Sequence, residues 1–575
     1  MDTTQVLKIQ KEFAQRTLAE PNSRHKRLYR LVCDGGWLNA GLEAVLSNRG
    51  SSTPGIDGET KSKIDARVNG RERLVRQLQE ELLDEGYQPQ PVRRVYIPKA
   101  NGKMRPLGIA TIRDRVVQAT VKMVLEPMYE SVFHPFSWGF RPLRSTHHAL
   151  SAVRRGPSDP RMKFKWIIEG DIRACFDEID HRLLRRFLKK RIQDRKLLDL
   201  ITLMLRCGIW ENNRVTYPQT GTPQGAVCSP LLANAFLHEF DDWYIRTYRI
   251  RPEWSHLASF QYRRKKEIGG TLMLTRYADD WVAVWNGSRE RAEEIKAEIK
   301  AFLADELKLR LSEEKTLITH IDGGFDFLGY RIVGDKRWSD GQWCLFSRVS
   351  EKAVWRFRDA VKEISQNAFT DEVAAFTALS GLIRGWGNYY AYAAESRLMD
   401  SLDAFIYQQM WKYCRRKSGR AGAKVVFRKY TLPRHLRKVG HFQLGLVVGD
   451  RVVRVPRLSS IPRKPLKLSY PPHPYLLKGR DYALPYSGTT DERWWDRHVW
   501  AGQEGHRIGQ RRLAVEVLAR DATCQVCGEH LAQEVHHAPA WKDSLKHKPN
   551  RAIGVCTECH RQRLHSVVKS EGEPR

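Results

Sequence analysis

The first candidate for chemistry in this chain is a run of four residues, Tyr277-Ala278-Asp279-Asp280. Two apolar runs flank it, residues 271–274 and 281–285, and their β-branched and aromatic side chains predict two short strands joined by an acidic turn. Adjacent ionised aspartates repel each other, so the arrangement is favourable mainly when a divalent cation such as Mg²⁺, which prefers oxygen ligands, neutralises them. Taken alone, the motif is equally typical of an acidic turn exposed to water.

A second carboxylate site changes this balance. Residues 164–171 predict a buried strand that ends at Asp171, and residues 179–192 predict an amphipathic helix with Asp180 as its N-cap. Two-metal phosphoryl transfer requires carboxylates of this kind, one at the end of a core strand and a pair on a hairpin. In that chemistry the ions activate the attacking 3′ oxygen and stabilise the leaving pyrophosphate.

Other elements must position these carboxylates and the substrate. Residues 95–99 and 103–109 predict a hairpin around Asn101-Gly102, and its Lys99 and Arg105 could clamp a triphosphate or simply be solvated. Residues 220–225, rich in Gly and Pro, precede a helix that begins at Ser229 and could let the backbone approach a base pair closely. Residues 136–142 interleave aromatics with an arginine, which suits either contact with a nucleic-acid strand or a packed turn. A further amphipathic helix is predicted to follow Ser288 as its cap.

The length of the chain indicates how many domains it has, and its charge indicates the class of its partner. The chain has 575 residues and a formal net charge of +32, with a pI near 9.8. We expect several domains and a polyanionic partner, and nucleic acid fits best because neutralising phosphates releases condensed counterions. The sequence has no 18-residue apolar run and no apolar signal segment at its N-terminus, so we expect an intracellular protein without a membrane partner.

Six ordered blocks together resemble the reverse transcriptases encoded by group II introns, over most of the chain. They are residues 97–99 with 105–108, 139–142, 171–177, 223–225, 277–280 and 327–329. The resemblance implies that Asp171, Asp279 and Asp280 are the catalytic carboxylates and hold two Mg²⁺ ions. The metal-binding alternative close by is Asp177.

The same resemblance implies roles for the residues that contact the nucleotide and the RNA. Lys99 and Arg105 would hold the incoming dNTP, Phe176 would reject a ribose 2′-OH, and Gln224 would touch the nascent base pair. Residues 381–390 resemble the maturase thumb, which binds intron RNA. The thumb residues expected to contact RNA are Arg384, Trp386, Tyr389 and Tyr390, although a helical core would use the aromatics equally. Residues 412–480 hold nineteen Lys or Arg against one acid and predict an extended, irregular nucleic-acid track.

The last sixty residues predict an independent module. Two C-x-x-C pairs have the spacing of a closed structural zinc site: Cys524, Cys527, Cys556 and Cys559. The module resembles the HNH nuclease appended to many of these reverse transcriptases, which uses one Mg²⁺. That resemblance implies a general base, His537, a residue that orients it, Asn550, and three metal ligands, His536, His560 and His565. A zinc-binding DNA module without nuclease chemistry is the alternative, because the spacing around Asn550 and His565 departs from the family pattern.

These observations predict an α+β multidomain protein with a right-hand polymerase and a small zinc-stapled ββα-type nuclease. The expected divisions are an N-terminal extension with fingers at 1–90, fingers and palm at 91–345, an α-helical thumb at 346–430, a basic DNA-binding region at 431–515, and the nuclease at 516–575. The expected function is RNA-directed DNA polymerase, splicing maturase and DNA endonuclease in group II intron mobility, with intron RNA, double-stranded DNA and dNTPs as partners. We expect a bacterial protein of the cytoplasm or nucleoid. The alternatives are a splicing maturase without polymerase activity and a reverse transcriptase in another role, such as defence.

Overall fold

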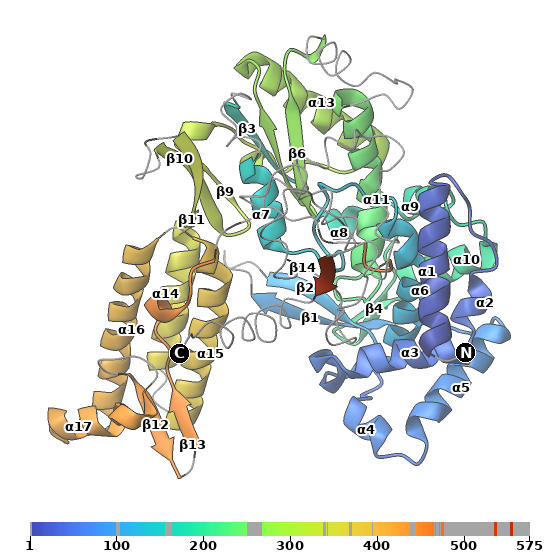
Figure 1. The fold of residues 1–575 in the computed structure, drawn as a ribbon. Helices are drawn as coiled ribbons and strands as arrows, with labels where there is room; N and C mark the ends of the chain where they lie inside the picture. The colour runs from blue at the N-terminus through green and yellow to red at the C-terminus, as the bar shows by residue number, and fades with distance from the viewer. Residues whose placement is uncertain are drawn as a thin grey trace, which may run out of the picture.

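The structure is a computed structural model, and it describes residues 3–98, 104–155, 164–249, 267–336, 341, 343–366, 371–393, 395–437, 443–449, 451–464, 466, 471, 473–476, 534–537 and 552–555. Over these residues the chain is a mixed α/β protein (Figure 1).

A four-stranded antiparallel sheet, which we call the central sheet, carries the residues singled out above. Its strands lie in the order β6 (Leu272–Tyr277), β7 (Asp280–Trp285), β3 (Trp166–Asp171) and β8 (Ile318–His320). The predicted strands before and after the acidic turn and the predicted strand ending at Asp171 are thereby confirmed. Alternate side chains of β3 enter two different cores, since Ile168 packs with the helices of one face and Ile167 with the elements of the other.

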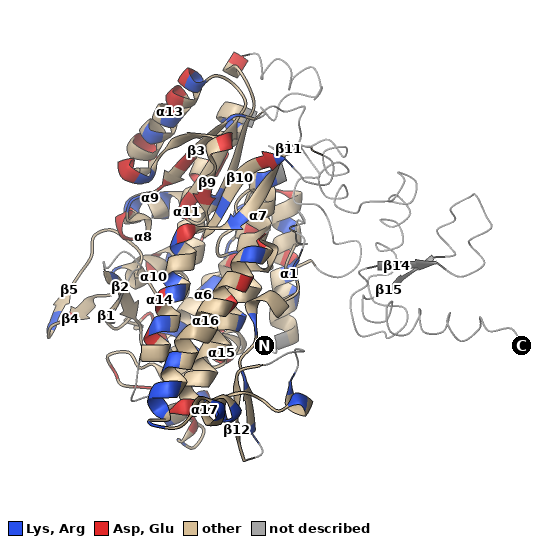
Figure 2. Cartoon of the chain, turned by 90° about the vertical axis from the view of Figure 1, so that its left-hand side faces the viewer, with Lys and Arg blue, Asp and Glu red and all other residues tan. Residues whose placement is uncertain are grey.

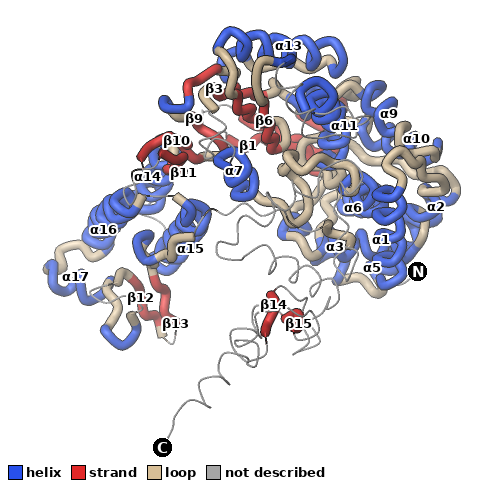
Figure 3. The backbone as a smooth tube through the Cα atoms, turned by 45° about the horizontal axis from the view of Figure 1, so that its top comes forward, coloured by secondary structure: helices blue, strands red, loops and turns tan. Residues whose placement is uncertain are grey.

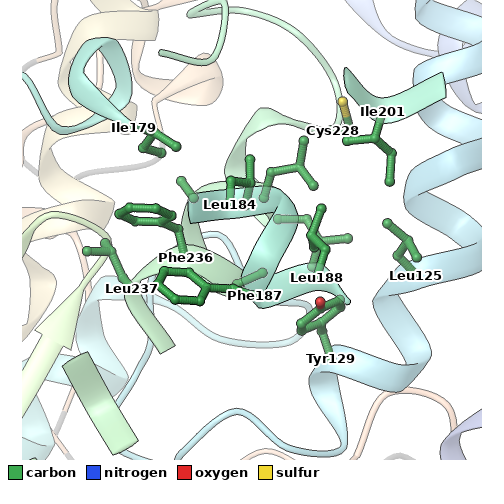
Figure 4. Close-up of a cluster of buried hydrophobic side chains, with 14 of the residues drawn as sticks. Leu125, Tyr129, Ile179, Leu184, Phe187, Leu188, Ile201, Cys228, Phe236 and Leu237 are labelled. Carbon is green, nitrogen blue, oxygen red and sulfur yellow. The ribbon is translucent and has the colours of Figure 1, made fainter. Parts of the chain in front are cut away.

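Helices cover the first face of the central sheet. They and the short turns between them are α6 (Ile112–Glu130), α8 (Cys175–Glu178), α9 (His181–Leu188), α10 (Arg195–Leu205), α11 (Ser229–Tyr244), η2 (Ile245–Arg249), α13 (Arg289–Leu307) and η3 (Glu313–Lys315). In contrast, α7 (Thr146–Arg155) and η4 (Ile321–Gly323) pack into the core of the second face. Asp180 and Ser288 cap α9 and α13 as predicted, although α9 ends at Leu188 rather than at residue 192. Figure 4 shows Leu184, Phe187 and Leu188 of α9 facing Phe236 of α11 and Leu125 of α6.

A second sheet, which we call the flap sheet, has the order β2 (Met104–Ile109), β1 (Val92–Pro98), β4 (Ile209–Glu211) and β5 (Arg214–Thr216). β1 and β2 pair antiparallel, as the predicted hairpin requires, and its turn and Lys99 lie outside the described residues. Six N-terminal elements precede the flap sheet: α1 (Thr3–Ala19), α2 (Tyr29–Val32), α3 (Gly35–Leu46), η1 (Arg49–Ser52), α4 (Lys61–Asp65) and α5 (Gly70–Leu83).

The second face of the central sheet meets a small sheet and a group of long helices. The sheet is β11 (Trp343–Val349), β10 (Tyr330–Lys336) and β9 (Phe325–Phe327). The helical elements that follow are α14 (Glu351–Gln366), α15 (Glu372–Tyr389), η5 (Tyr390–Tyr392), α16 (Ser396–Lys417) and α17 (Ala423–Tyr430). Figures 1 and 3 show α14, α15 and α16 side by side. One hydrophobic core joins them to β9–β11 and to Ile167, Val282 and Val284 of the central sheet.

The basic region after α17 differs from the expected irregular track. Its elements are η6 (Arg434–Leu436), β12 (Gly445–Val448), β13 (Arg451–Arg454) and η7 (Leu458–Ser460), and β12 and β13 form an antiparallel hairpin. Leu446 and Val453 of this hairpin are buried in the core of the long helices. The expectation of extended, irregular backbone is therefore wrong for this part, because the two strands pair and the cross-strand apolar pair Leu446 and Val453 enters that core.

Residues 473–476, which we call the strap, return to the other end of the molecule and pack on α6. The Tyr475 hydroxyl donates to Glu126 Oε2 at 2.6 Å, the His473 Nε2 and Ser131 Oγ atoms lie 3.1 Å apart, and Leu476 is 1% exposed. His473 and Leu476 are therefore buried against the body of the protein rather than open to a nucleic acid.

Two short strands are described in the last sixty residues. β14 (Glu534–His537) pairs antiparallel with β15 (Ala552–Val555), and the register places His536 opposite Ile553 and His537 opposite Ala552. The four cysteines, Asn550, His560 and His565 lie outside the described residues. Within the part of the chain that the structure describes, none of the helices combines the length and the apolar character needed to cross a bilayer.

Candidate active site

Three carboxylates meet at one end of the central sheet. Asp171 is the last residue of β3 and Asp280 the first of β7, and the antiparallel register places them directly opposite each other. Asp279 lies in the two-residue turn between β6 and β7, because Tyr277 and Asp280 are the last pair of that hairpin. Side chains opposite each other in an antiparallel pair lie close together, so Asp171 and Asp280, 109 positions apart in sequence, face each other.

The nearby positive charges do not fully neutralise the three carboxylates, and the pKa values of two of them are raised. Desolvation within the site, followed by the charges of Asp279 and Asp171, raises the pKa of Asp280 to about 7. Burial raises the pKa of Asp279 as well, and the Asp171 charge adds to it. The Asp280 residue as a whole remains exposed to solvent, so a hydrated cation can reach the cluster from outside.

Two cations stand next to the carboxylates. Lys315, in η3, places its Nζ atom 2.8 Å from Asp171 Oδ2. Arg105, exposed on β2 of the flap sheet, partly offsets through its charge the rise that burial causes in the pKa of Asp279. The structure thus brings the predicted Arg105 to the site, and it adds Lys315, to which the sequence patterns assigned no role.

Phe176 lies in the short helix α8, five residues after Asp171. Its ring meets the ring of Phe140 edge-on, with centroids 6.0 Å apart, and its carbonyl accepts a hydrogen bond from the Thr222 backbone N–H at 2.7 Å. The loop at residues 220–225 is therefore seated against the turn that follows β3. This contact places the loop that carries Gln224, the predicted base-pair contact, beside Phe176, the predicted gate residue.

Gln224 joins that loop to both sides of the site. Its carbonyl accepts from the Gly108 N–H of β2 at 2.7 Å, and its side-chain Nε2 donates to Asp177 Oδ2 at 3.0 Å. Gly225 has φ +105°, and a Cβ there would lie 2.9 Å from the Gly108 carbonyl oxygen, so the approach of loop and strand requires glycine. Asp177 is exposed and contacts Gln224, so the structure gives the alternative metal ligand a different partner.

The ligand type of the cluster suits a divalent cation. Its donors are hard carboxylate oxygens from two adjacent strands, which is the ligand type that Mg²⁺ prefers. The raised pKa values of Asp279 and Asp280 report repulsion that a bound cation would relieve. An arrangement of this kind can bind a metal ion together with the phosphates of a nucleotide.

The expected RNA-contacting residues on α15 and at the start of η5 do not all face solvent. Arg384 is exposed, whereas Tyr390 is 6% exposed and its ring packs against Tyr330 and Trp386, with centroids 5.0 and 4.5 Å away. The Tyr389 hydroxyl donates to the Leu328 carbonyl at 2.7 Å. The expectation that Tyr390 offers a stacking surface is therefore wrong, because its ring is part of the core; RNA contact by Arg384, Trp386 and Tyr389 stays a prediction.

Comparison with known families agrees with this arrangement. Residues 97–332 match the family described as reverse transcriptase (RNA-dependent DNA polymerase), and residues 354–431 match the maturase-specific domain of group II introns. The first match contains the central sheet, the flap sheet except residues 92–96 of β1, and all three carboxylates. The second covers the long helices from residue 354 onward. The class is thus a reverse transcriptase joined to a maturase domain.

Similar proteins narrow this class. Protein YkfC of Escherichia coli is 37% identical over 363 residues, which cover 61% of this chain and 94% of that protein. The group II intron-encoded protein LtrA of Lactococcus lactis is 29% identical over an alignment of 616 positions, which covers 94% of this chain and 96% of LtrA. This chain belongs to the group II intron-encoded reverse transcriptase and maturase family.

Proposed function

We propose that this protein copies RNA into DNA at the cluster of Asp171, Asp279 and Asp280, and that it does so within a right-hand polymerase. In this proposal the central sheet is the palm, the flap sheet belongs to the fingers, and α14–α16 form the thumb. The observation that carries it is the register that sets Asp171 opposite Asp280 inside the matched reverse transcriptase region.

The three carboxylates would hold Mg²⁺, which when bound lowers the barrier to nucleotidyl transfer by activating the 3′ oxygen and neutralising the developing charge. Arg105, and Lys99 on the same hairpin, would hold the phosphates of the incoming dNTP. Phe176 would exclude a ribose 2′-OH, and Gln224 would meet the nascent base pair from the loop seated on β2.

The test of the polymerase site removes the acidic pair. Asp279→Ala combined with Asp280→Ala should abolish Mg²⁺-dependent cDNA synthesis on a primed RNA template while RNA binding persists. The matched control is Glu293→Ala with Glu294→Ala, which removes two adjacent acids from the exposed surface of α13 and should leave synthesis intact. Substantial cDNA from the Asp279/Asp280 variant would refute the proposal.

The same chain is proposed to bind the RNA of its own group II intron and to assist its splicing. Support comes from the maturase-specific match over residues 354–431 and from the similarity to LtrA, whose name describes an intron-encoded protein. Figure 2 shows Lys and Arg residues along α14, α16 and α17, which gives RNA phosphates a cationic surface to meet. Sequencing the RNA that co-purifies with the protein tests this part, since random cellular RNA would contradict it.

The C-terminal module is proposed to be an HNH endonuclease that cuts the DNA target and so supplies the primer for intron mobility. Its cysteines would bind a structural Zn²⁺, His537 would act as the general base, and one Mg²⁺ would be held by other histidines of the module. The antiparallel pairing of β14 with β15, with His536 and His537 on β14, supports a ββα-type arrangement. Nicking of duplex target DNA by the full chain is the direct test.

A further inference from the structure

A buried arginine stands directly behind the acidic turn. Arg276, near the end of β6, is 0% exposed, and all five of its N–H donors have acceptors. Nε and Nη2 donate to the two carboxylate oxygens of Asp241 at 2.8 and 2.5 Å. Nη1 donates to Asn234 Oδ1 at 3.2 Å and to the Ala278 carbonyl at 2.9 Å, and Nη2 also donates to Ser137 Oγ at 2.8 Å.

The bond to the Ala278 carbonyl reaches the turn that carries the carboxylates. Ala278 is the first of the two turn residues and has φ +58°, a left-handed conformation that residues other than glycine, asparagine and aspartate seldom adopt. Its carbonyl belongs to the peptide group that continues into Asp279. Arg276 therefore fixes the peptide from which Asp279 projects, in a conformation that alanine does not favour by itself.

A second element supports the turn from outside the sheet. The Arg276 N–H donates to the Phe136 carbonyl at 2.9 Å, and the Trp138 N–H donates to the Arg276 carbonyl at 2.8 Å, so residues 136–138 run along β6 as an extra edge. A Cβ on Gly139 would lie 2.4 Å from the Ala278 nitrogen. The Gly139 carbonyl accepts from Asn234 Nδ2 at 2.8 Å. The backbone of Gly139 thus touches the backbone of the turn.

We propose that five residues, Arg276, Asp241, Asn234, Ser137 and Gly139, form a strut that sets the position of Asp279 and Asp280 for cation binding. They are positioning residues, because they act through the turn and none of these contacts is with a carboxylate of the cluster. A buried ion pair adds little stability over a well-packed apolar pair, so stability alone does not explain why Arg276 and Asp241 are here. An apolar pair could not make the hydrogen bonds from Arg276 to Ala278, Asn234 and Ser137, and these bonds hold the turn in place. This inference rests on the proposed polymerase function, since it concerns the same carboxylates.

The gentlest test is Gly139→Ala. The added methyl group changes no charge and meets backbone atoms of the turn, so either the turn or residues 136–139 must shift. The full chain is titrated with MgCl₂ alone, and the cation-induced rise in thermal stability is measured beside the Mg²⁺ dependence of nucleotide incorporation. The half-saturating Mg²⁺ concentration should increase about 10- to 100-fold in both measurements, as for other changes to groups that orient metal ligands. In the control Gly86→Ala the new Cβ has its nearest neighbour, the Glu81 carbonyl oxygen, 3.9 Å away, and both values should stay at those of the parent.

A second variant removes the ion pair without leaving a buried charge. Arg276→Met with Asp241→Leu takes both charges away, so the sheet and α11 should still pack, while the bonds to Ala278, Asn234 and Ser137 are lost. Its control is Arg113→Met with Glu81→Leu. That ion pair joins α6 to α5, its side chains are 19% and 25% exposed, and Arg113 otherwise contacts Asp114 and the Tyr87 ring rather than the turn or residues 136–139.

The control pair should lower the melting temperature without changing the Mg²⁺ dependence, whereas the Arg276/Asp241 variant should weaken the response to Mg²⁺ about 10-fold or more. If Gly139→Ala and the Arg276/Asp241 variant both respond to Mg²⁺ as the parent does, the strut has no positioning role. A failure of the proposed polymerase function gives a different result, because the Asp279→Ala, Asp280→Ala variant would then still make cDNA.

Discussion

The raised pKa of Asp280 predicts that the metal-free protein loses stability as the pH rises, and that Asp280→Asn prevents this loss. A carboxyl group with a pKa of about 7 in the folded protein, against an ordinary 3.8, binds its proton more tightly when folded. Between about pH 4 and pH 7 the folded state therefore carries more of this proton than the unfolded state, and the free energy of unfolding falls as the pH rises through that window.

The size of the effect follows from the same two pKa values. Their difference sets a ceiling of about 4 kcal/mol above pH 7, at 1.36 kcal/mol for each pKa unit. Because Asp280 is exposed to solvent, screening reduces this, and we expect about 1–2 kcal/mol. Asparagine cannot ionise, so the advantage of Asp280→Asn over the parent should grow by that amount between about pH 4.5 and pH 8.

The assay is urea unfolding of the full chain in EDTA across this pH range, with hydrogen exchange of peptides from β3 and β7 to identify the transition of the central sheet. Glu294→Gln, a neutralised acid on the exposed face of α13, is the control and should keep the pH dependence of the parent. Saturating Mg²⁺ should flatten the pH dependence of the parent, because the cation takes the place of the proton. Equal pH dependence for the parent and Asp280→Asn in EDTA would refute the reasoning.

Three further predictions concern residues outside the carboxylate cluster. Phe176→Ala should incorporate ribonucleotides far better than the parent, since the wall against the 2′-OH is gone, and unchanged discrimination in single-nucleotide incorporation would mean that another residue forms the gate. His537→Ala should reduce nicking of target DNA about 10²–10⁴-fold and spare extension of a supplied primer, whereas Cys524→Ala should also weaken DNA retention because the zinc site contributes folding energy; parental nicking by His537→Ala would place the base elsewhere. Tyr475→Phe should lower the stability of the full chain by about 1–3 kcal/mol in thermal unfolding, because the buried Glu126 carboxyl loses its hydroxyl donor; an unchanged transition would contradict that role for the strap.

The elements that carry the carboxylates were predictable because each has a strong local signal. A mainly apolar run ends at Asp171, and two apolar runs enclose the acidic turn, so the sequence places all three side chains at strand ends or in the turn between strands. That Asp171 and Asp280 face each other is a matter of register between strands far apart in sequence, and no local pattern encodes it.

The support of the turn was not predicted. Arg276 interrupts an apolar strand and Asp241 lies in an apolar helix, and these two anomalies were the signal that could have suggested a buried ion pair. For residues 136–142 the sequence left two interpretations, and burial of Trp138 and Arg141 favours the packed turn over a nucleic-acid contact. The sequence also left two interpretations for Tyr390, because a core and a stacking surface both use aromatic rings, and its burial favours the core.

The path of the strap has a consequence for how the chain can be divided. A protein shortened to end at residue 466 would strip the cover from α6 and leave Glu126 buried without the Tyr475 hydroxyl, whereas one that ends at residue 476 would keep both. The region around α6 therefore depends on residues beyond the end of the maturase match at residue 431. Its buried contact with Tyr475 comes from a segment more than forty residues further along the chain. Proteolysis or gene truncation would preserve these buried contacts only if the cut falls beyond residue 476.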